Sequence, residues 1–376
     1  MLCSEGQHCS GGVCLVTCVP GDLRCSGNTP QRCNATGQWY DRPLGACQSS
    51  TCLSGSCKGE CALGEARCQG PTPQACDVNG NWQDQPACSS SCVSGSCPGP
   101  SCAGLPETCG PQKNESCCLS PVVWGGTYNR SNRAEYPATV SDFRLDRFEV
   151  TVGRFRAFVK EFPQNLPKEG AGAHPLIPQS GWLSSWSSLL PKDKVALKAE
   201  LKCDNRTTWT DAAGTDEELP INCINWYMAF AFCAWDGGRL PTEAEWNYAA
   251  AGGGEQRIYP WSNPPDDQTI DQTYAVYYSP VPSPVGSTSP KGDGKWRQAD
   301  LGGNVTEWML DWYNISYDSM CIDCAKLSPV VGSRALRSGS WNYDETYIVT
   351  SYRDEDIPAG KSIWRAIEGI RCARQP

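Results

Sequence analysis

Apolar residues follow helical spacing in two adjacent stretches of the chain. Residues 225–235 carry apolar side chains on nearly every helical face, which predicts a buried helix ending at the glycine pair 237–238, where a positive φ is easily reached. Thr242 then provides a good N-cap, and Glu245 lies three residues on as its capping-box partner. A second helix is therefore predicted after Thr242, joined to the first by a tight turn.

An upstream stretch changes its hydrophobic period at Thr151. Apolar residues alternate as in a strand through Phe148 and then recur at helical spacing as far as Phe162. The segment 163–220 is rich in Pro, Gly and Ser, with one predicted helix at 192–202. Its three tryptophans either line a ligand groove or anchor the loop, and we expect them to pack the loop onto the core: Trp182, Trp186 and Trp209.

Cysteines set residues 1–118 apart, because 19 of the 25 lie there. With few large apolar residues, this region must be held together by disulfides. Two copies of one six-cysteine unit occupy 18–57 and 61–97, and the cysteines of each copy allow 15 pairings. We expect these copies to form a stalk, because their loops lack aromatic or charged clusters. The other parts are a partial copy, a terminal knot and one globular domain, at residues 3–14, 102–118 and 119–376.

Disulfides on this scale are typical of an oxidising compartment, so we expect a secreted, periplasmic or cell-surface protein. No basic and apolar leader follows Met1, and residues 3–14 look like the end of a preceding copy, so we expect the export signal to lie outside this chain. No apolar run approaches the length of a transmembrane segment. The net charge of −9 argues against a nucleic-acid partner, because phosphate binding needs clustered Lys and Arg.

Histidine is too scarce for several common metal and catalytic sites. Only His8 and His174 are present, which excludes a three-histidine site, a helical HExxH zinc site and a two-histidine iron site within the globular domain. A Ser-His-Asp triad would depend on His174, which lies in a Gly- and Pro-rich loop, and we do not expect one.

Four ordered motifs resemble the signature of the formylglycine-generating enzyme and sulfatase-modifying factor family. They are GGRLPTEAEWNYAAA from Gly237, LGGNVTEWMLDWY from Leu301, RSGSWNYDETYIVTSYR from Arg337 and GIRCAR from Gly369. The resemblance covers roughly residues 119–376. It implies an α+β fold of the C-type-lectin-like type, with little regular secondary structure.

The segment DLGGNVTE places two carboxylates seven residues apart, with glycines between them. Hard oxygen ligands on such a turn suit Ca²⁺, and the alternative is a capped turn with solvated acids. The family binds a structural calcium at the corresponding motif. The resemblance therefore implies side-chain ligands from Asp300 and Glu307 and carbonyl ligands from Gly303 and Val305. The family's second calcium site, further upstream, has no recognisable match here.

The catalytic segment departs from the family pattern. Formylglycine-generating enzymes carry two copper(I)-binding cysteines after the Gly-Ser-aromatic motif, and soft sulfur ligands favour that metal. Ser340 is present in that motif, but the two cysteine positions hold Tyr343 and Ile348. Copper-dependent formylglycine generation is therefore not expected of this chain.

Six cysteines remain in the globular domain. The human family enzyme resembles this sequence around Cys233 and Cys372 and joins the two positions, so the resemblance implies that disulfide here. Local pairing of the other four leaves no free thiol: Cys203 with Cys223, and Cys321 with Cys324. The last pair is a C-x-x-C motif in a Ser- and Asp-rich loop, where a structural disulfide is expected rather than a redox site.

Two functions remain open. In the first, a non-catalytic, calcium-stabilised lectin-like domain on a disulfide-rich stalk binds a protein or carbohydrate outside the cell. In the second, an oxidoreductase or other enzyme of the family uses a site without the copper cysteines. The candidates for that pocket are Ser340, Tyr343, Tyr352, Arg353 and Asp354. We favour the first function.

Overall fold

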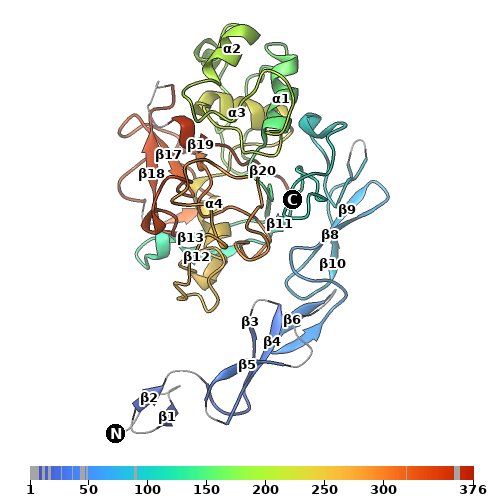
Figure 1. The fold of residues 1–376 in the computed structure, drawn as a ribbon, viewed down its shortest axis with the longest axis vertical. Helices are drawn as coiled ribbons and strands as arrows, with labels where there is room; N and C mark the ends of the chain where they lie inside the picture. Colours follow the sequence, from blue (N-terminus) through green and yellow to red (C-terminus); the bar gives the residue numbers. More distant parts are fainter. Residues whose placement is uncertain are drawn as a thin grey trace.

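The computed structural model describes residues 8–10, 13–15, 18–26, 28–35, 37–42, 47, 50–88, 91–318, 320–359 and 365–376. Small β-units follow one another along the cysteine-rich region, and a rounded domain follows them (Figure 1). Within the described residues, no helix is both long enough and apolar enough to cross a membrane.

The two repeat copies have the same three-stranded antiparallel sheet. In the first copy the strands are β3 (Leu23–Ser26), β4 (Thr29–Cys33) and β5 (Trp39–Asp41), followed by the hairpin β6 (Thr51–Leu53) and β7 (Ser56–Lys58). The second copy has β8 (Ala66–Gln69), β9 (Thr72–Cys76) and β10 (Trp82–Asp84). The partial copy contributes a hairpin like β6–β7, made of β1 (His8–Ser10) and β2 (Val13–Leu15).

Both copies use the same disulfide connectivity, in which the first cysteine joins the third, the second joins the fifth and the fourth joins the sixth. In the first copy these are Cys18–Cys33, Cys25–Cys52 and Cys47–Cys57. In the second they are Cys61–Cys76, Cys68–Cys92 and Cys88–Cys97. One pairing out of the 15 that are possible therefore recurs in both units.

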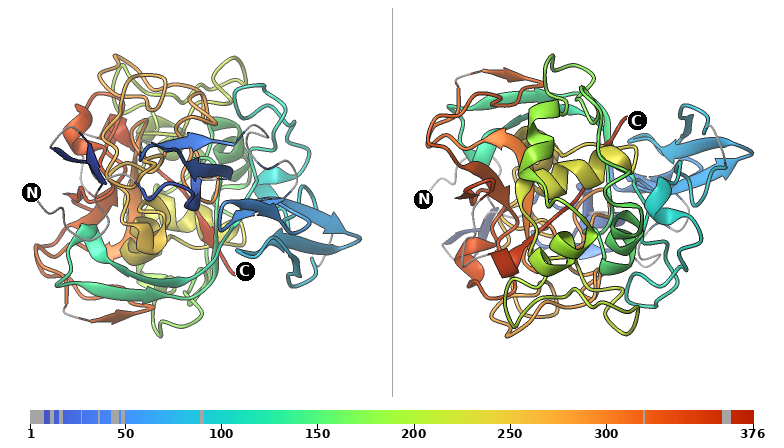
Figure 2. Two further views of the ribbon diagram at one scale, coloured as in Figure 1. Left: turned by 90° about the horizontal axis from the view of Figure 1, so that it is seen from below. Right: turned by 90° about the horizontal axis from the view of Figure 1, so that it is seen from above.

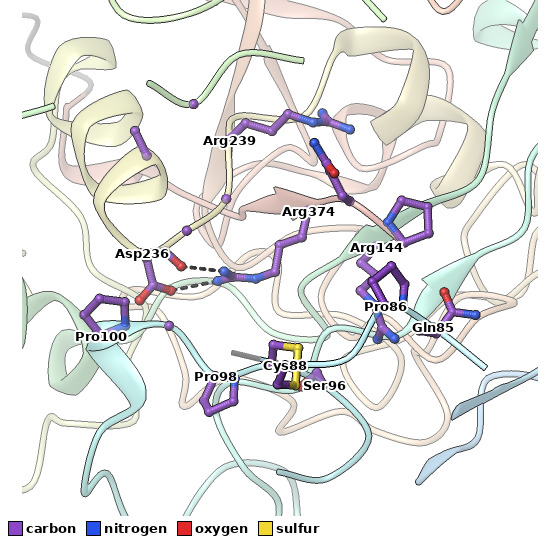
Figure 3. Close-up of a pocket in the computed structure, with 18 of the residues that line it drawn as sticks. Gln85, Pro86, Cys88, Ser96, Pro98, Pro100, Arg144, Asp236, Arg239 and Arg374 are labelled. Atoms are coloured by element: carbon purple, nitrogen blue, oxygen red, sulfur yellow. Dashed lines mark hydrogen bonds and ion pairs between the residues drawn. A yellow bond between two sulfur atoms is a disulfide. The ribbon is translucent and has the colours of Figure 1, made fainter. Parts of the chain in front are cut away.

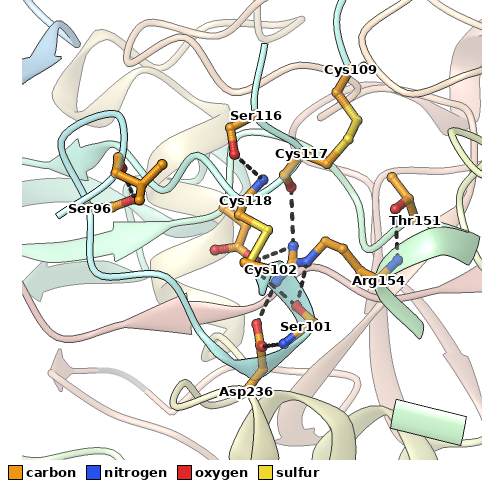
Figure 4. Close-up of a disulfide and its surroundings, with 12 residues drawn as sticks. Ser96, Ser101, Cys102, Cys109, Ser116, Cys117, Cys118, Thr151, Arg154 and Asp236 are labelled. Carbon is orange, nitrogen blue, oxygen red and sulfur yellow. Dashed lines mark hydrogen bonds and ion pairs between the residues drawn. A yellow bond between two sulfur atoms is a disulfide. The ribbon is translucent and has the colours of Figure 1, made fainter. Parts of the chain in front are cut away.

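The terminal knot is built into the globular domain. Its disulfides are Cys102–Cys118 and Cys109–Cys117 (Figure 4). The second packs against Phe148 in an apolar cluster. Strand β14 ends at Leu145, earlier than the alternation predicts, and Phe148 is buried against the knot instead. The knot is thus part of the core that the domain buries.

Buried charges fasten the knot to the first and third helices. The Arg154 guanidinium donates to the Ser101 hydroxyl at 3.1 Å and to the Asp236 carboxylate at 2.7 Å, and the Ser101 amide donates to the same carboxylate at 2.8 Å (Figure 4). Arg154 and Asp236 are fully buried. Arg154 also pairs with Asp146 at 2.9 Å. Asp236 also pairs with Arg374 at 2.7 Å. Loss of either Arg154 or Asp236 would therefore leave this buried charge network unbalanced, which is destabilising.

Four α-helices lie in the described part of the domain: α1 (Val152–Glu161), α2 (Lys194–Glu200), α3 (Trp226–Trp235) and α4 (Glu243–Ala250). Helices α1, α2 and α3 gather at one end of the domain (Figures 1 and 2). Helix α3 is buried along most of its length, and α4 begins with the predicted capping box of Thr242 and Glu245. Both helix predictions are confirmed.

Three small sheets form the described β-structure of the domain. The first has the order β11-β14-β20, with bounds Val122–Val123, Phe143–Leu145 and Ala373–Arg374. The second has the order β12-β13-β16, with bounds Gly126–Asn129, Pro137–Val140 and Cys321–Ile322. The third has the order β18-β17-β15-β19, with bounds Asp354–Asp356, Arg334–Arg337, Thr306–Trp312 and Glu368–Gly369. Strands distant in sequence therefore meet in every sheet.

The insertion between α1 and α3 is anchored by its tryptophans. Trp182 and Trp209 are buried, and Trp186 packs edge-on against Trp226 of α3 at 5.1 Å between ring centroids. These contacts remove large apolar side chains from water, which offsets the entropic cost of ordering a long loop. The tryptophans thus attach the loop to the core.

The globular domain has three further disulfides: Cys233–Cys372, Cys203–Cys223 and Cys321–Cys324. The described part of the chain holds no free cysteine. The first of these disulfides joins α3 to the segment before β20 across 139 residues of sequence, and the third spans only 3.

Loop length predicts how much each disulfide stabilises the domain. In the chain-entropy model, the Cys233–Cys372 bridge contributes about 5 kcal/mol and the Cys321–Cys324 bridge about 2 kcal/mol. Replacing both cysteines of the long bridge by alanine should therefore lower the free energy of unfolding in urea much more than the same change in the short bridge. Equal losses for the two double variants would contradict this.

Candidate functional site

A tight turn carries the expected calcium ligands. Asp300 and Asn304 have φ of 58°, and Gly303 has φ of 97°. A Cβ on Gly303 would lie 2.4 Å from the Val276 carbonyl oxygen, so only glycine fits there. The turn leads directly into β15, and its position against residue 276 fixes where its carbonyls and side chains lie.

Glu307 lies at the start of β15 with its carboxylate held by two buried side chains. Arg371 donates to it at 2.8 Å and 3.0 Å, and the Trp246 indole of α4 donates at 2.6 Å. The Arg371 guanidinium also donates to three carbonyls: those of Asp146, Arg147 and Ala299. Glu307, which the family resemblance implies as a calcium ligand, therefore already forms a buried ion pair with Arg371.

A third buried carboxylate, Glu149, lies beside the turn. It accepts hydrogen bonds from the Asn304 side chain at 2.6 Å and from the Val305 amide at 3.1 Å. Burial raises the pKa of Glu149 well above its ordinary value, with a further contribution from the charge of Asp300. Burial also raises the pKa of Asp300 to about 6. Sequence reasoning missed Glu149, because nothing local marks a residue whose partners lie so far along the chain.

The charges around this turn fit a divalent cation. Glu149, Asp300 and Glu307 are three buried carboxylates that interact with one another, and Arg371 is the cation that offsets their charge. When all three are ionised the group keeps an excess of negative charge, which a buried Ca²⁺ would offset. The Asp300 carboxylate and the Gly303 and Val305 carbonyls would supply the oxygen ligands, and Glu307 would have to share its carboxylate with Arg371. The described residues show no group of three or more acidic, histidine or cysteine side chains placed to hold a metal ion, so the carbonyls would be needed.

The two copper positions of the family are filled by groups that cannot be thiolates. Ile348 is fully buried in an apolar cluster with Tyr259 and Ala275. Tyr343 donates its hydroxyl to the Asp354 carboxylate at 3.1 Å. Burial raises the pKa of the Tyr343 hydroxyl far above its ordinary range, so it stays neutral. Neither position offers a soft, charged ligand for copper(I).

The remaining pocket candidates point in different directions. Ser340 is fully buried and donates to the Asn342 side chain at 2.7 Å. Tyr352 and Tyr343 both hydrogen-bond to Asp354. Arg353, next to Asp354 in sequence, instead forms two hydrogen bonds with Glu243 of α4, at 2.6 Å and 2.9 Å. The five candidates therefore do not converge on one reacting centre.

Other reactive groups are occupied too. Cys321 and Cys324 are joined to each other, and the described residues hold no free cysteine. His174 is buried and pairs with Glu245 at 3.3 Å. That glutamate is already the capping-box partner in α4, so His174 has a structural contact rather than a serine nucleophile.

A cavity of about 660 Å³ lies between the second repeat copy and the globular domain (Figure 3). The charged side chains on its wall are buried and bonded to protein groups. Arg374 pairs with Asp236 at 2.7 Å, and Arg239 pairs with Glu245 at 2.7 Å. Arg144 also lines the cavity and donates to the Ser120 carbonyl at 2.7 Å, but its second terminal nitrogen has no hydrogen-bond partner in the described residues.

Comparisons with known proteins agree with the motifs. The model of the family described as "Sulfatase-modifying factor enzyme 1-like domain" matches residues 107–376. The bovine "Inactive C-alpha-formylglycine-generating enzyme 2" (Bos taurus) is 30% identical over 231 residues, which cover 54% of this chain and 66% of that protein. The mouse "Formylglycine-generating enzyme" (Mus musculus) is 28% identical over 298 residues, which cover 71% of this chain and 77% of that protein.

Among solved structures, "Treponema denticola variable protein 1" aligns with a TM-score of 0.47 and 20% identity, covering 68% of this chain and 95% of that one. PvdO from Pseudomonas aeruginosa aligns with a TM-score of 0.46 and 18% identity, covering 68% and 94%.

The family match spans more than half of the chain, so this protein belongs to the sulfatase-modifying factor enzyme 1-like family. Its fold is the α+β, C-type-lectin-like fold of formylglycine-generating enzymes, with a disulfide-rich region before it. The family match begins at residue 107, inside the terminal knot, which fits the packing of that knot onto the domain.

The Arg353–Glu243 pair gives a testable pH dependence. Burial alone would raise the pKa of Glu243, but the charges of Arg337 and Arg353 outweigh it and lower the pKa to about 2. The carboxylate therefore contributes about 3 kcal/mol of stability above pH 4.5, which is lost as the pH falls towards about 2. Glu243→Gln should be less stable than the wild type at pH 7, and the difference should shrink over that window in urea unfolding.

Glu355→Gln, at an exposed position on the neighbouring strand β18, is the matched control and should unfold like the wild type at every pH. A difference between Glu243→Gln and wild type that stays constant from pH 7 to about pH 2 would show that the pair has no such role.

Proposed function

We propose that this protein is a non-catalytic recognition protein of its family, in which a calcium-stabilised lectin-like domain on a disulfide-rich region binds a protein or carbohydrate. The observation that carries the proposal is the pair of side chains at the two copper positions. Ile348 is fully buried there, and the Tyr343 hydroxyl stays neutral. The described residues also hold no free thiol that could substitute for them. Oxidation of a cysteine by the copper mechanism needs thiolate ligands, so this domain lacks its reacting centre.

The fold remains suited to binding after that loss. Its buried charge pairs, tryptophan anchors and disulfides make a rigid body, which lowers the entropic cost of binding a partner. The name of the bovine relative includes the word "inactive", which is consistent with a family branch that has given up catalysis. We propose that this chain serves outside the cytosol, secreted, periplasmic or on the cell surface, because its disulfides need an oxidising compartment.

Turnover is the direct test of the non-catalytic proposal. A peptide with a sulfatase-type cysteine motif, incubated with the protein, copper(I) and oxygen, should remain unmodified in mass spectrometry. The mouse formylglycine-generating enzyme, run on the same peptide, is the positive control. Formylglycine in the sample with this protein would sink the proposal.

Calcium is proposed at Asp300, Gly303, Val305 and Glu307, supported by the excess of buried carboxylates beside that turn. An ion bound only by the folded state raises stability, by about 2.7 kcal/mol at a hundredfold excess over its Kd. Chelation should therefore lower the Tm of the wild type, and added Ca²⁺ should restore it.

Asp300→Ala removes a ligand without breaking the Glu307–Arg371 pair, so its Tm should no longer respond to chelator or to added Ca²⁺. The exposed substitution Asp211→Ala is the control and should keep the full response. A wild-type Tm that is indifferent to both additions would rule out the calcium site.

A further inference from the structure

A groove of about 1000 Å³ lies between the first repeat copy and the globular domain. The repeat contributes residues of β3, β4 and β6, and the domain contributes the loops 261–265 and 289–297. The two walls are joined where the Asn263 side chain donates to the Ser26 hydroxyl at 2.8 Å. Figure 1 shows the strands β3 and β6 of this copy facing the loops at the lower end of the domain.

The charge of this groove is opposite to that of the chain. Its lining includes three acids, Glu115, Glu255 and Asp293, and six cations: Arg24, Arg147, Arg257, Lys291, Lys295 and Arg297. All three acids pair with cations of the groove itself. The whole chain has a net charge of −9, so the groove is a local excess of positive charge on an acidic protein. A concave site with such an excess attracts anionic ligands.

Lys291 is held in place by a column of aromatic rings. Tyr259 stacks on Trp261 at 5.0 Å, Trp261 stacks on Tyr274 at 5.6 Å, and the Lys291 ammonium lies 4.0 Å from the centre of the Tyr274 ring. Its nearest acid in the described residues, Asp271, is 4.0 Å away and more than half exposed. Lys291 also donates to the Thr273 hydroxyl. Its acidic contact in the described residues is long and exposed to solvent, where an ion pair is weak, so the ammonium charge remains available to a ligand.

Arg24 and Arg297 present two more cations from opposite sides. Arg24 lies 4.4 Å above the Trp39 ring and donates to the neutral Gln31 side chain. Arg297 is exposed, and a Cβ on Gly64 of the second copy would lie 3.0 Å from its methylene carbons. Neither arginine has an acidic partner in the described part of the chain. Both repeat copies thus help to form the basic site.

We propose that this groove binds an anionic carbohydrate chain, one that carries sulfate or uronate groups along its length. The cations Arg24, Lys291 and Arg297 would contact the anionic groups. An acidic peptide fits less well, because peptide grooves gain affinity from apolar anchor pockets, and the apolar side chains here are mostly prolines and cystines. This inference rests on the proposed recognition function and names its ligand.

The test is a calorimetric titration of the full chain with a heparin-derived oligosaccharide at low ionic strength. Binding should be saturable and should weaken as salt is added, because exposed charges are screened within about 10 Å at 0.1 M salt. The variant Lys291→Glu/Arg297→Glu should bind at least about tenfold more weakly.

Two exposed lysines outside the groove provide the matched control. Lys168→Glu/Lys192→Glu changes the net charge of the chain by the same amount and should bind within about twofold of wild type. If the groove double variant unfolds at lower temperature than wild type, the single variant Lys291→Gln replaces it and should still weaken binding.

The proposal is overturned if the wild type does not bind the oligosaccharide, if the two double variants lose the same affinity, or if an oligoglutamate of equal charge binds as tightly. Each of these results leaves the formylglycine assay unaffected. Detection of formylglycine would in turn refute the non-catalytic proposal without changing the titration, so the two ideas fail separately.

Discussion

The ion pair between Glu307 and Arg371 is the contact on which the globular domain depends. Both side chains are fully buried, and Arg371 also donates to carbonyls in two other segments. One arginine therefore connects the strand β15, the C-terminal segment, the loop after β14 and the residue before the turn at 300–305 to one another. A buried charge that loses its partner costs about 3–5 kcal/mol, so none of these segments can move independently.

Because these segments are held to one another, the domain is a rigid support for the repeats that pack against it. The repeats contact that support at more than one place: the Trp124 indole donates to the Cys76 carbonyl at 2.9 Å, and Asn263 donates to Ser26. The repeats that were predicted to form a stalk therefore lie against the domain. Both repeat copies line the basic groove together with the domain, and rigid walls of this kind lower the entropic cost of binding a ligand.

Local signals predicted the parts of the fold that a few residues decide, such as the capping box of Thr242 and Glu245. Motif order predicted the family and the replacement of the copper ligands by Tyr343 and Ile348. Glu149 was missed because its partner Asn304 lies 155 residues away, and no periodicity marks such a contact. The disulfide pairing of the repeats was also open, since six cysteines alone do not select one of their 15 pairings.

The central claim is that the copper chemistry of the family has been lost while the fold has been kept for recognition. Elemental analysis of the purified full chain tests it most directly. A copper enzyme retains copper, whereas a calcium-stabilised binding protein needs calcium and no copper. The account predicts calcium in stoichiometric amount and only traces of copper. Stoichiometric copper, or another redox metal in its place, would contradict it.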